Sequence, residues 1–228
     1  MREKELIIHT TARALISTVA AVVVMGIAAT ASAVAVCDPI PLGVLDGCIE
    51  ANKTKILIHD DPNPLKAAKD KLKWSWLKGG ILSGEALGNP LTGGTEYALC
   101  IYDGAGGVPV LVKELQAPAG AVYWRVKSQN GFQYKDTTRS NDGLLKVRLK
   151  ADPIRLGRSQ VKLSARGAAL QPPGPPLAFP LQYFEQDPSV IINLVNTEGT
   201  CWTSEYLPAS AGGDVRKNVA RDFRAQTR

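Results

Sequence analysis

The sequence has 228 residues and a formal net charge of +6 at pH 7, from 27 Lys and Arg against 21 Asp and Glu. This mildly basic balance is too weak to indicate a nucleic-acid partner, and no basic and aromatic recognition motif accompanies it. Hydrophobic residues make up 45% of the chain, which is enough for one well-buried core and excludes a disordered polar protein.

The N-terminus predicts a signal peptide over residues 1–33. An apolar run at 14–29 follows a basic start and leads into the small-residue pattern ASA at 31–33. The alternative is a retained membrane anchor, because the uncharged stretch 14–36 is long enough to span a bilayer. Cleavage is favoured, since no basic stop-transfer cluster follows. We therefore expect a secreted or periplasmic protein, with membrane contact only if the N-terminal segment is retained.

Four cysteines follow the predicted cleavage point: Cys37, Cys48, Cys100 and Cys201. An even number in an oxidising compartment predicts two disulfide bonds, for which three pairings exist. The pairing of Cys37 with Cys48 and of Cys100 with Cys201 is favoured, because it closes a short N-terminal loop and ties a central strand to the last one. A metal site is not expected, since the cysteines are widely scattered and form no C-x-x-C motif.

From residue 56 to residue 206 the chain alternates apolar and polar residues in short segments between turns. This period of two predicts an all-β fold, a two-layer antiparallel β-sandwich of about nine or ten strands after the signal helix. The segments read as strands are, in chain order, KILIHD, KLKWSWLKG, EYALCIYDG, VPVLVKELQ, AVYWRVKS, GFQYKD, LLKVRLK, SQVKLSARG, LAFPLQYFEQ, SVIINLVN and TCWTSEYL. One domain over 34–207 is expected, with EYALCIYDG central and buried on both faces.

The remaining segment, 208–228, differs from the preceding region in composition and in the spacing of its apolar residues. It is basic overall, and Val215, Val219 and Phe223 are spaced by four residues. A short amphipathic helix and a frayed extension both fit this spacing, and we expect a poorly ordered basic tail.

Four segments together, KLKWSWLKG, EYALCIYDG, GFQYKD and the final CW, resemble an uncharacterised secreted bacterial β-rich domain found in exported proteins. The resemblance covers roughly residues 37–206 and implies secretion and a β-rich fold. It implies no activity, substrate or catalytic residue. Members often have a further cysteine pair near 119–124, where this sequence has Ala121 and Tyr123, and this departure weakens any transfer of a disulfide map.

His59, Asp60 and Asp61 are adjacent, with Asp70 nearby, and such a group can bind a metal or act as acid and base. Neighbouring residues of a strand point to opposite faces, however, and HDDPNP is typical of a strand that ends in a turn. No EF-type loop, G-x-S-x-G, H-E-x-x-H or Walker motif is present. We therefore assign no catalytic residue, metal or cofactor, and keep a secreted hydrolase using His59 and loop carboxylates as an alternative.

The four tryptophans, Trp74, Trp76, Trp124 and Trp202, are candidates for a sugar-stacking platform, which makes a carbohydrate-binding module a further alternative. Trp74 and Trp76 share one face of a strand, a pattern more typical of a sandwich core. Trp202 lies on the face opposite Cys201. If that cysteine is bridged inward, Trp202 points outward and is the best single candidate for an exposed contact.

The hairpin over 144–166 is the most distinctive predicted surface. Its outward positions are Lys146, Arg148, Lys150, Lys162 and Arg166, with Arg155 and Arg158 in the turn and Asp152 as the offsetting acid. Such a cationic stripe favours binding to an acidic glycan or an anionic cell-envelope surface. The alternative is a solvated face whose cations discourage strand pairing at a sheet edge. The sequence thus predicts an exported non-enzymatic β-sandwich for surface interaction or envelope structure.

Overall fold

The computed structural model describes residues 37, 47–104, 108–174, 182–184, 189–208, 210 and 213–227. This part of the chain forms an all-β sandwich of one eight-stranded and one four-stranded antiparallel sheet, which confirms the predicted fold class. The described residues belong to one compact unit that spans 32–228. The predicted signal peptide, residues 1–33, lies outside the described residues.

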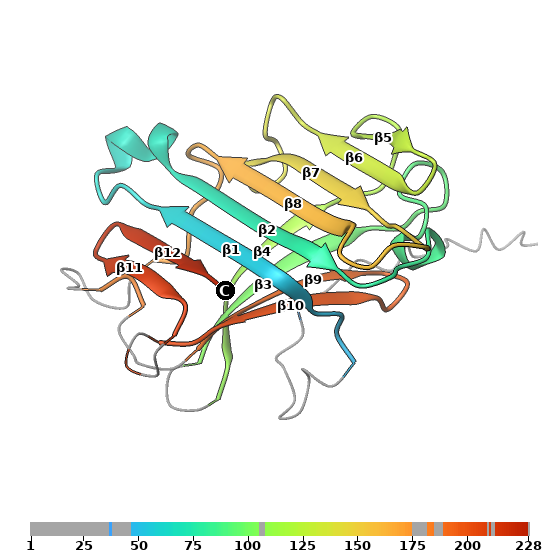
Figure 1. Ribbon diagram of the computed structural model, residues 1–228. Helices are drawn as coiled ribbons and strands as arrows, with labels where there is room; N and C mark the ends of the chain where they lie inside the picture. The colour runs from blue at the N-terminus through green and yellow to red at the C-terminus, as the bar shows by residue number, and fades with distance from the viewer. Residues whose placement is uncertain are drawn as a thin grey trace, which may run out of the picture. The chain divides into compact units, whose positions relative to one another are not determined.

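The larger sheet contains β1 (Ala51–His59), β2 (Lys71–Gly79), β5 (Trp124–Ser128), β6 (Gly131–Lys135), β7 (Leu144–Lys150), β8 (Ser159–Arg166), β11 (Val215–Val219) and β12 (Asp222–Gln226). Their order across the sheet is β11-β12-β1-β2-β8-β7-β6-β5 (Figure 1). The predicted hairpin of β7 and β8 therefore lies inside the sheet, between β6 and β2.

The smaller sheet contains β3 (Tyr97–Asp103), β4 (Val110–Ala117), β9 (Val190–Asn196) and β10 (Cys201–Tyr206), in the order β10-β9-β3-β4. Two short 3-10 helices lie in connections: η1 (Pro64–Lys69) between β1 and β2, and η2 (Glu85–Leu87) between β2 and β3.

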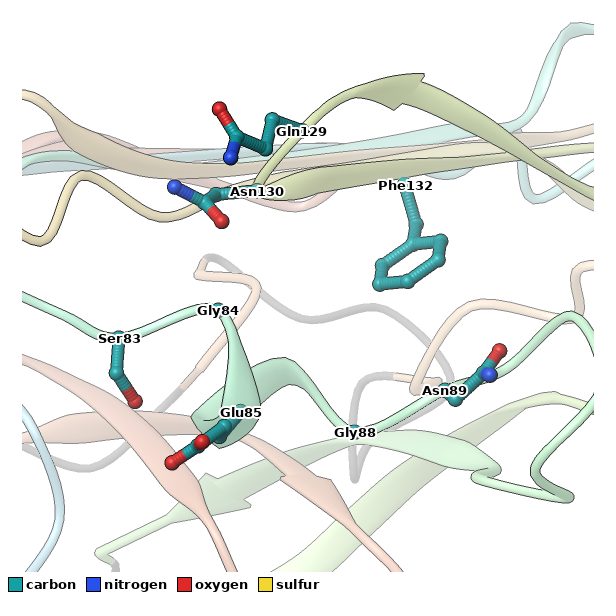
Figure 2. A pocket seen from close by; sticks show the side chains of 8 residues that line it. All are labelled: Ser83, Gly84, Glu85, Gly88, Asn89, Gln129, Asn130 and Phe132. Atoms are coloured by element: carbon teal, nitrogen blue, oxygen red, sulfur yellow. The ribbon is translucent and has the colours of Figure 1, made fainter.

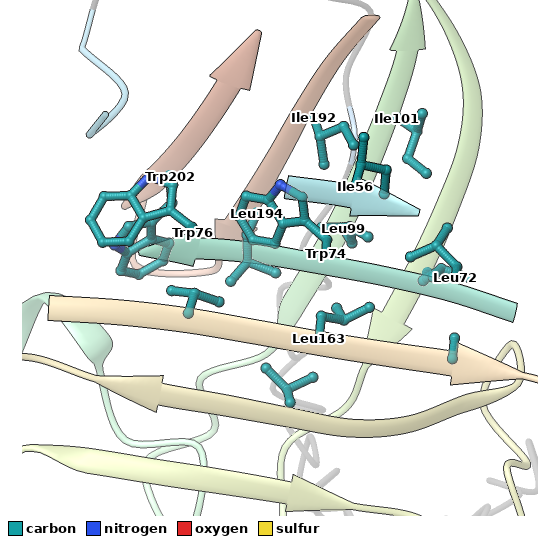
Figure 3. Packing of buried hydrophobic residues seen from close by; sticks show 14 of the residues in the cluster. Ile56, Leu72, Trp74, Trp76, Leu99, Ile101, Leu163, Ile192, Leu194 and Trp202 are labelled. Carbon is teal, nitrogen blue, oxygen red and sulfur yellow. The ribbon is translucent and has the colours of Figure 1, made fainter. Parts of the chain in front are cut away.

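The core lies between the two sheets, where the inward residues of each alternating strand meet (Figure 3). In β2, Leu72, Trp74 and Trp76 are buried, whereas Lys71 and Lys73, at the alternate positions, are exposed. The indole Nε1 of Trp74 donates to Ser204 Oγ of β10 over 2.9 Å, so a polar contact across the core satisfies the buried ring. The expectation that Trp74 and Trp76 are core residues is confirmed.

Strand β3 is buried on both faces, as its apolar sequence predicts. Leu99 and Ile101 face the main core. On the opposite face, Ala98, Cys100 and Tyr102 belong to a second small cluster with Cys37 and Ile191. Cys100 therefore points away from the space between the sheets.

The disulfide bonds join Cys37 to Cys100 and Cys48 to Cys201, so two bonds are confirmed but the favoured pairing is wrong. The reason is the strand order: β9 lies between β3 and β10, the strands that contain Cys100 and Cys201. Strands two places apart are separated by roughly 10 Å, which exceeds the ~7 Å limit between the Cα atoms of a disulfide.

The expectation of a poorly ordered tail from residue 208 is also wrong for the residues that the structure describes. Strands β11 and β12 form a hairpin, and β12 pairs with β1 from Lys55 to His59. Phe223 and Ala225 of β12 are buried in the main core. The spacing of four was misleading because only Phe223 of the three residues is buried, so the sandwich domain extends beyond residue 207 to β12.

The two disulfide bonds indicate an oxidising, non-cytoplasmic compartment. Within the described ranges, no helix has the length and apolar character that a membrane crossing requires.

Candidate functional site

The five cations predicted from the 144–166 hairpin lie on one surface. Lys146, Arg148 and Lys150 belong to β7, and Lys162 and Arg166 belong to β8. The residues between them, such as Val147 and Leu163, are buried in the core. Because side chains alternate along each strand, the cations project from the outer face of the larger sheet.

Neighbouring strands extend this surface beyond the hairpin. Antiparallel pairing puts Lys71 opposite Arg166, Ser75 opposite Lys162 and Lys135 opposite Lys146. We define the basic face as a set of outward cations on the seven neighbouring strands from β12 to β5: Lys53, Lys55, Lys71, Lys73, Arg125, Lys135, Lys146, Arg148, Lys150, Lys162, Arg166 and Arg224. Lys217 of the edge strand β11 lies opposite Arg224 and is not included, because it is ion-paired with Asp222. The sequence could not reveal this set, because it depends on which strands are neighbours.

Like charges stand directly opposite each other within this face. Arg148 pairs with Lys162, Lys135 with Lys146, and Lys71 with Arg166. Such cross-strand pairs repel, and each costs a few tenths to about 1 kcal/mol. The sheet tolerates this repulsion at three places.

Carboxylates do not relieve this repulsion within the described strands. The outward carboxylate there is Asp222 of β12, whose Oδ1 lies 2.8 Å from His59 Nδ1 and whose Oδ2 lies 2.6 Å from Lys217 Nζ. Partial burial opposes ionisation, but the hydrogen bonds from Lys217 and His59 outweigh it and lower the pKa of Asp222 below 3.8. Asp222 is thus committed to other partners, and in the described residues no cation of the basic face has an ion pair.

A hollow of about 290 Å³ lies in the middle of the basic face. It is lined by Lys73, Ser75, Lys146, Arg148, Lys162, Leu163 and Ser164. Four cationic groups and two hydroxyls that converge on one hollow suit an anionic oxygen group, since each can donate a hydrogen bond.

Protection of a sheet edge does not explain these cations. Strands β2, β8 and β7 are interior strands with a hydrogen-bonded neighbour on each side. Cations discourage unwanted pairing only where a strand edge is free. The part of the alternative interpretation that assigns these cations to the protection of a sheet edge is therefore wrong.

Trp202, the other predicted binding residue, is wrongly assigned. Its side chain has no exposed surface and packs in the main core, close to Trp76 (Figure 3). Its ring centre lies 6.2 Å from that of Tyr97. The prediction required Cys201 to point inward, but that cysteine is bonded to Cys48 and the adjacent Trp202 takes the inward position. Trp74, Trp76 and Trp124 are also buried, so the tryptophans form no sugar-stacking platform.

His59, Asp60 and Asp61 do not converge on one site, because they make contacts with different partners. His59 hydrogen-bonds to Asp222, and the Asp61 backbone N–H donates to Asp70 Oδ1 over 2.9 Å. Burial raises the pKa of Asp60, and the charges of Asp70 and Asp61 add to this effect against the opposing effect of His59. No hydroxyl or thiol hydrogen-bonds to His59 in the described part of the chain, so the structure assembles no nucleophile beside it.

Among the described residues, no three His, Cys, Asp or Glu side chains are placed together so that they could hold a metal ion. The same ranges contain no free cysteine.

A second hollow, of about 510 Å³, lies between the turn that joins β5 to β6 and the loop that contains η2 (Figure 2). Its lining comprises Ser83, Gly84, Glu85, Gly88, Asn89, Gln129, Asn130 and Phe132. Phe132 pairs with Leu149, a core residue, and so belongs to the inward side of the sheet. This hollow is thus distinct from the basic face, and Glu85 is the acidic residue of its lining.

Comparisons of the chain with protein-family models, with curated proteins and with solved structures found no match.

Proposed function

We propose that the protein is an exported, non-enzymatic binding domain that holds an acidic glycan of the cell envelope or its surroundings on the basic face. The N-terminal pattern of residues 1–33 supports export, and the two disulfide bonds suit an oxidising compartment.

The observation on which the proposal depends is the set of like-charge pairs inside the larger sheet, without carboxylate partners in the described residues. A bound polyanion would neutralise both members of each pair and remove their repulsion. Two effects therefore favour binding: the attraction between the cations and the ligand, and the loss of the repulsion between paired cations that is present in the free protein.

Shape also suits an extended ligand. From β1 to β5 the sheet spans six neighbouring strands, a width of about 24 Å at ~4.8 Å between strands. A chain that crosses the strands through the central hollow meets Lys55, Lys162, Arg148 and Arg125 in one row of paired positions. Several charges of one polymer can therefore be engaged together.

A polymer with carboxylate or sulfate groups fits this surface better than a single-stranded nucleic acid. Proteins that bind single strands stack the bases on exposed aromatic side chains. The tryptophans of the larger sheet, Trp74, Trp76 and Trp124, are buried on its inner side. The face thus offers charge and hydroxyl groups within the described strands, which matches an acidic sugar polymer.

Charge reversal in the central hollow tests the proposal. We expect Arg148→Glu with Lys162→Glu to weaken affinity for a heparin-like polymer on the order of 1000-fold at low salt, because each cation near an anionic surface contributes about 1 kcal/mol and reversing its charge counts twice. Elution from the immobilised polymer in a salt gradient measures the change, since screening weakens surface attraction.

The matched control reverses Lys66 and Lys69 of η1, which are exposed and lie outside the sheet. Both double variants change the net charge equally. We expect the control to elute close to the wild type. Identical elution of the two variants would mean that only net charge matters, and the proposed face would then be rejected.

A further inference from the structure

Three exposed aliphatic side chains lie in two neighbouring connections at one end of the larger sheet. Ile154 and Leu156, in the β7–β8 connection, are 80% and 73% exposed, and Ile81, which follows β2, is 60% exposed. Leu82 N donates to Asp152 O over 3.0 Å, and Gly157 N donates to Gly79 O over 2.9 Å. These two hydrogen bonds bracket the three side chains, which we call the apolar tip.

The β7–β8 connection is held in place by Asp152. Its Oδ1 accepts hydrogen bonds from the backbone N–H groups of Ile154 and Arg155, and its Oδ2 accepts from the Arg155 guanidinium. Asp152 N donates in turn to the buried Ser159 Oγ. These contacts fix the backbone of the connection at Ile154 and Arg155, next to the exposed side chain of Leu156.

Cations surround the apolar tip. Arg155 and Arg158 flank Leu156 in the same connection, and Lys78, at the end of β2, is exposed. Asp152 neutralises Arg155 through an ion pair of 2.9 Å, while Arg158 and Lys78 have no ion pair within the described ranges. The basic face begins immediately beyond, with Lys150.

We infer that the apolar tip inserts into the interfacial region of an anionic lipid bilayer. Aliphatic side chains gain free energy by entering the boundary between headgroups and acyl chains, and adjacent cations are attracted to anionic headgroups. Exposed apolar groups rimmed by polar residues mark a membrane or protein contact, and the net positive charge around this group favours an anionic lipid surface.

This inference goes beyond the proposed glycan binding and involves different residues. The apolar tip lies beyond the ends of β2 and β7, whereas the basic face lies along the length of the strands. Insertion of the tip therefore leaves the central hollow accessible, so both contacts can form at once. The protein would then hold an acidic polymer next to a membrane surface.

Sedimentation with lipid vesicles tests the inference on the exported protein. We expect binding to vesicles of 70% phosphatidylcholine and 30% phosphatidylglycerol but not to vesicles of phosphatidylcholine alone, because both insertion and charge are needed. Ile154→Ser with Leu156→Ser should weaken this binding about tenfold or more. The same variant should elute from the heparin-like polymer like the wild type, which separates the tip from the basic face.

The matched control is Leu65→Ser with Val122→Ser. These two aliphatic side chains are 91% and 86% exposed. Leu65 precedes β2 and Val122 precedes β5, so both lie at the end of the larger sheet that is away from the apolar tip. Both double variants have the same charge as the wild type, and we expect the control to bind vesicles normally. Equal loss in both variants, or no loss in the tip variant, would overturn the inference.

A second readout reports the position of the tip directly. An environment-sensitive fluorophore on Ile154→Cys should shift to shorter wavelength with the anionic vesicles, whereas the same fluorophore on Val122→Cys should not. If the protein sediments with vesicles while the fluorophore at position 154 remains in water, then another part of the chain binds the membrane and the inference is wrong.

Discussion

Asp136 is a buried carboxylate that organises the connection between β6 and β7. Its Oδ1 accepts from the backbone N–H groups of Thr138 and Arg139 and from the Thr138 hydroxyl. Its Oδ2 accepts from the backbone N–H and the hydroxyl of Ser140. Burial alone would raise the pKa of Asp136, but these hydrogen bonds to the charged form lower it from 3.8 to about 2.

We expect Asp136→Asn to lower the free energy of unfolding by about 2 kcal/mol at neutral pH. The amide NH₂ of asparagine would face N–H and O–H groups that now donate hydrogen bonds to the carboxylate, and it cannot accept from them. The folded pKa of Asp136 lies below its unfolded value of 3.8. The contribution of ionised Asp136 to the free energy of unfolding is therefore present above pH 4 and is lost as the pH falls toward 2. Chemical denaturation at several pH values should show the difference between variant and wild type shrinking over this range.

The hairpin of β11 and β12 illustrates how a terminal element completes a sheet. Strand β12 supplies hydrogen-bonded partners to β1 from Lys55 to His59. The ring of Phe223 packs edge-on against Phe184 at 4.7 Å between ring centres. Without the hairpin, β1 would be an edge strand and Phe223 would leave the core, so the hairpin is part of the folded unit.

We expect Phe223→Ala to lower the free energy of unfolding by about 3–5 kcal/mol, because it leaves a cavity in a packed core. Val219→Ala, at a position in β11 that is 43% exposed, is the control and should cost less than about 0.5 kcal/mol. Denaturant titrations of both variants measure the difference. Equal stability of the two variants would show that β12 does not pack in the core.

At the scale of the whole molecule, the Cys48–Cys201 bond joins the two layers of the sandwich. Cys48 directly precedes the segment that leads into β1 of the larger sheet, and Cys201 begins β10 of the smaller sheet. Ile49 N donates to Cys201 O, and Thr203 N donates to Ile49 O, so the bond lies beside a short parallel bridge. The Cys37–Cys100 bond instead fastens Cys37 to the outer side of the smaller sheet.

The bonds close loops of different lengths, with sequence separations of 153 and 63 residues. On the chain-entropy model we expect removal of Cys48–Cys201 by paired alanine substitution to cost up to about 5 kcal/mol, and removal of Cys37–Cys100 up to about 4 kcal/mol. Denaturation under non-reducing conditions measures both. Peptide mapping of the unreduced protein should recover the two crosslinked pairs, and a 37–48 or 100–201 crosslink would contradict the structure.

The two sheets also differ in the charged side chains that they present. The basic face covers the outer side of the larger sheet, whereas Glu114 and Glu205 lie on strands of the smaller sheet. A net charge of +6 therefore understates the positive potential of the larger sheet. This separation would orient the protein with the basic face toward the acidic glycan that we propose as its ligand.

The sequence by itself determined the all-β class, the burial of β3 on both faces and the outward cations of β7 and β8. Each follows from alternation within one strand, because successive side chains of a strand point to opposite faces. The same local rule identified Trp74 and Trp76 as core residues. Two disulfide bonds were also expected from the even number of cysteines.

Only the tertiary structure decided which strands are neighbours. The position of β9 between β3 and β10 excludes a Cys100–Cys201 bond, and the pairing of β12 with β1 brings the C-terminal segment into the sandwich. The inward direction of Trp202 and the spread of cations from β7 and β8 onto β2 and β1 depend on the same order. Strand order joins residues far apart in the chain, and a pattern with a period of two residues contains no information about it.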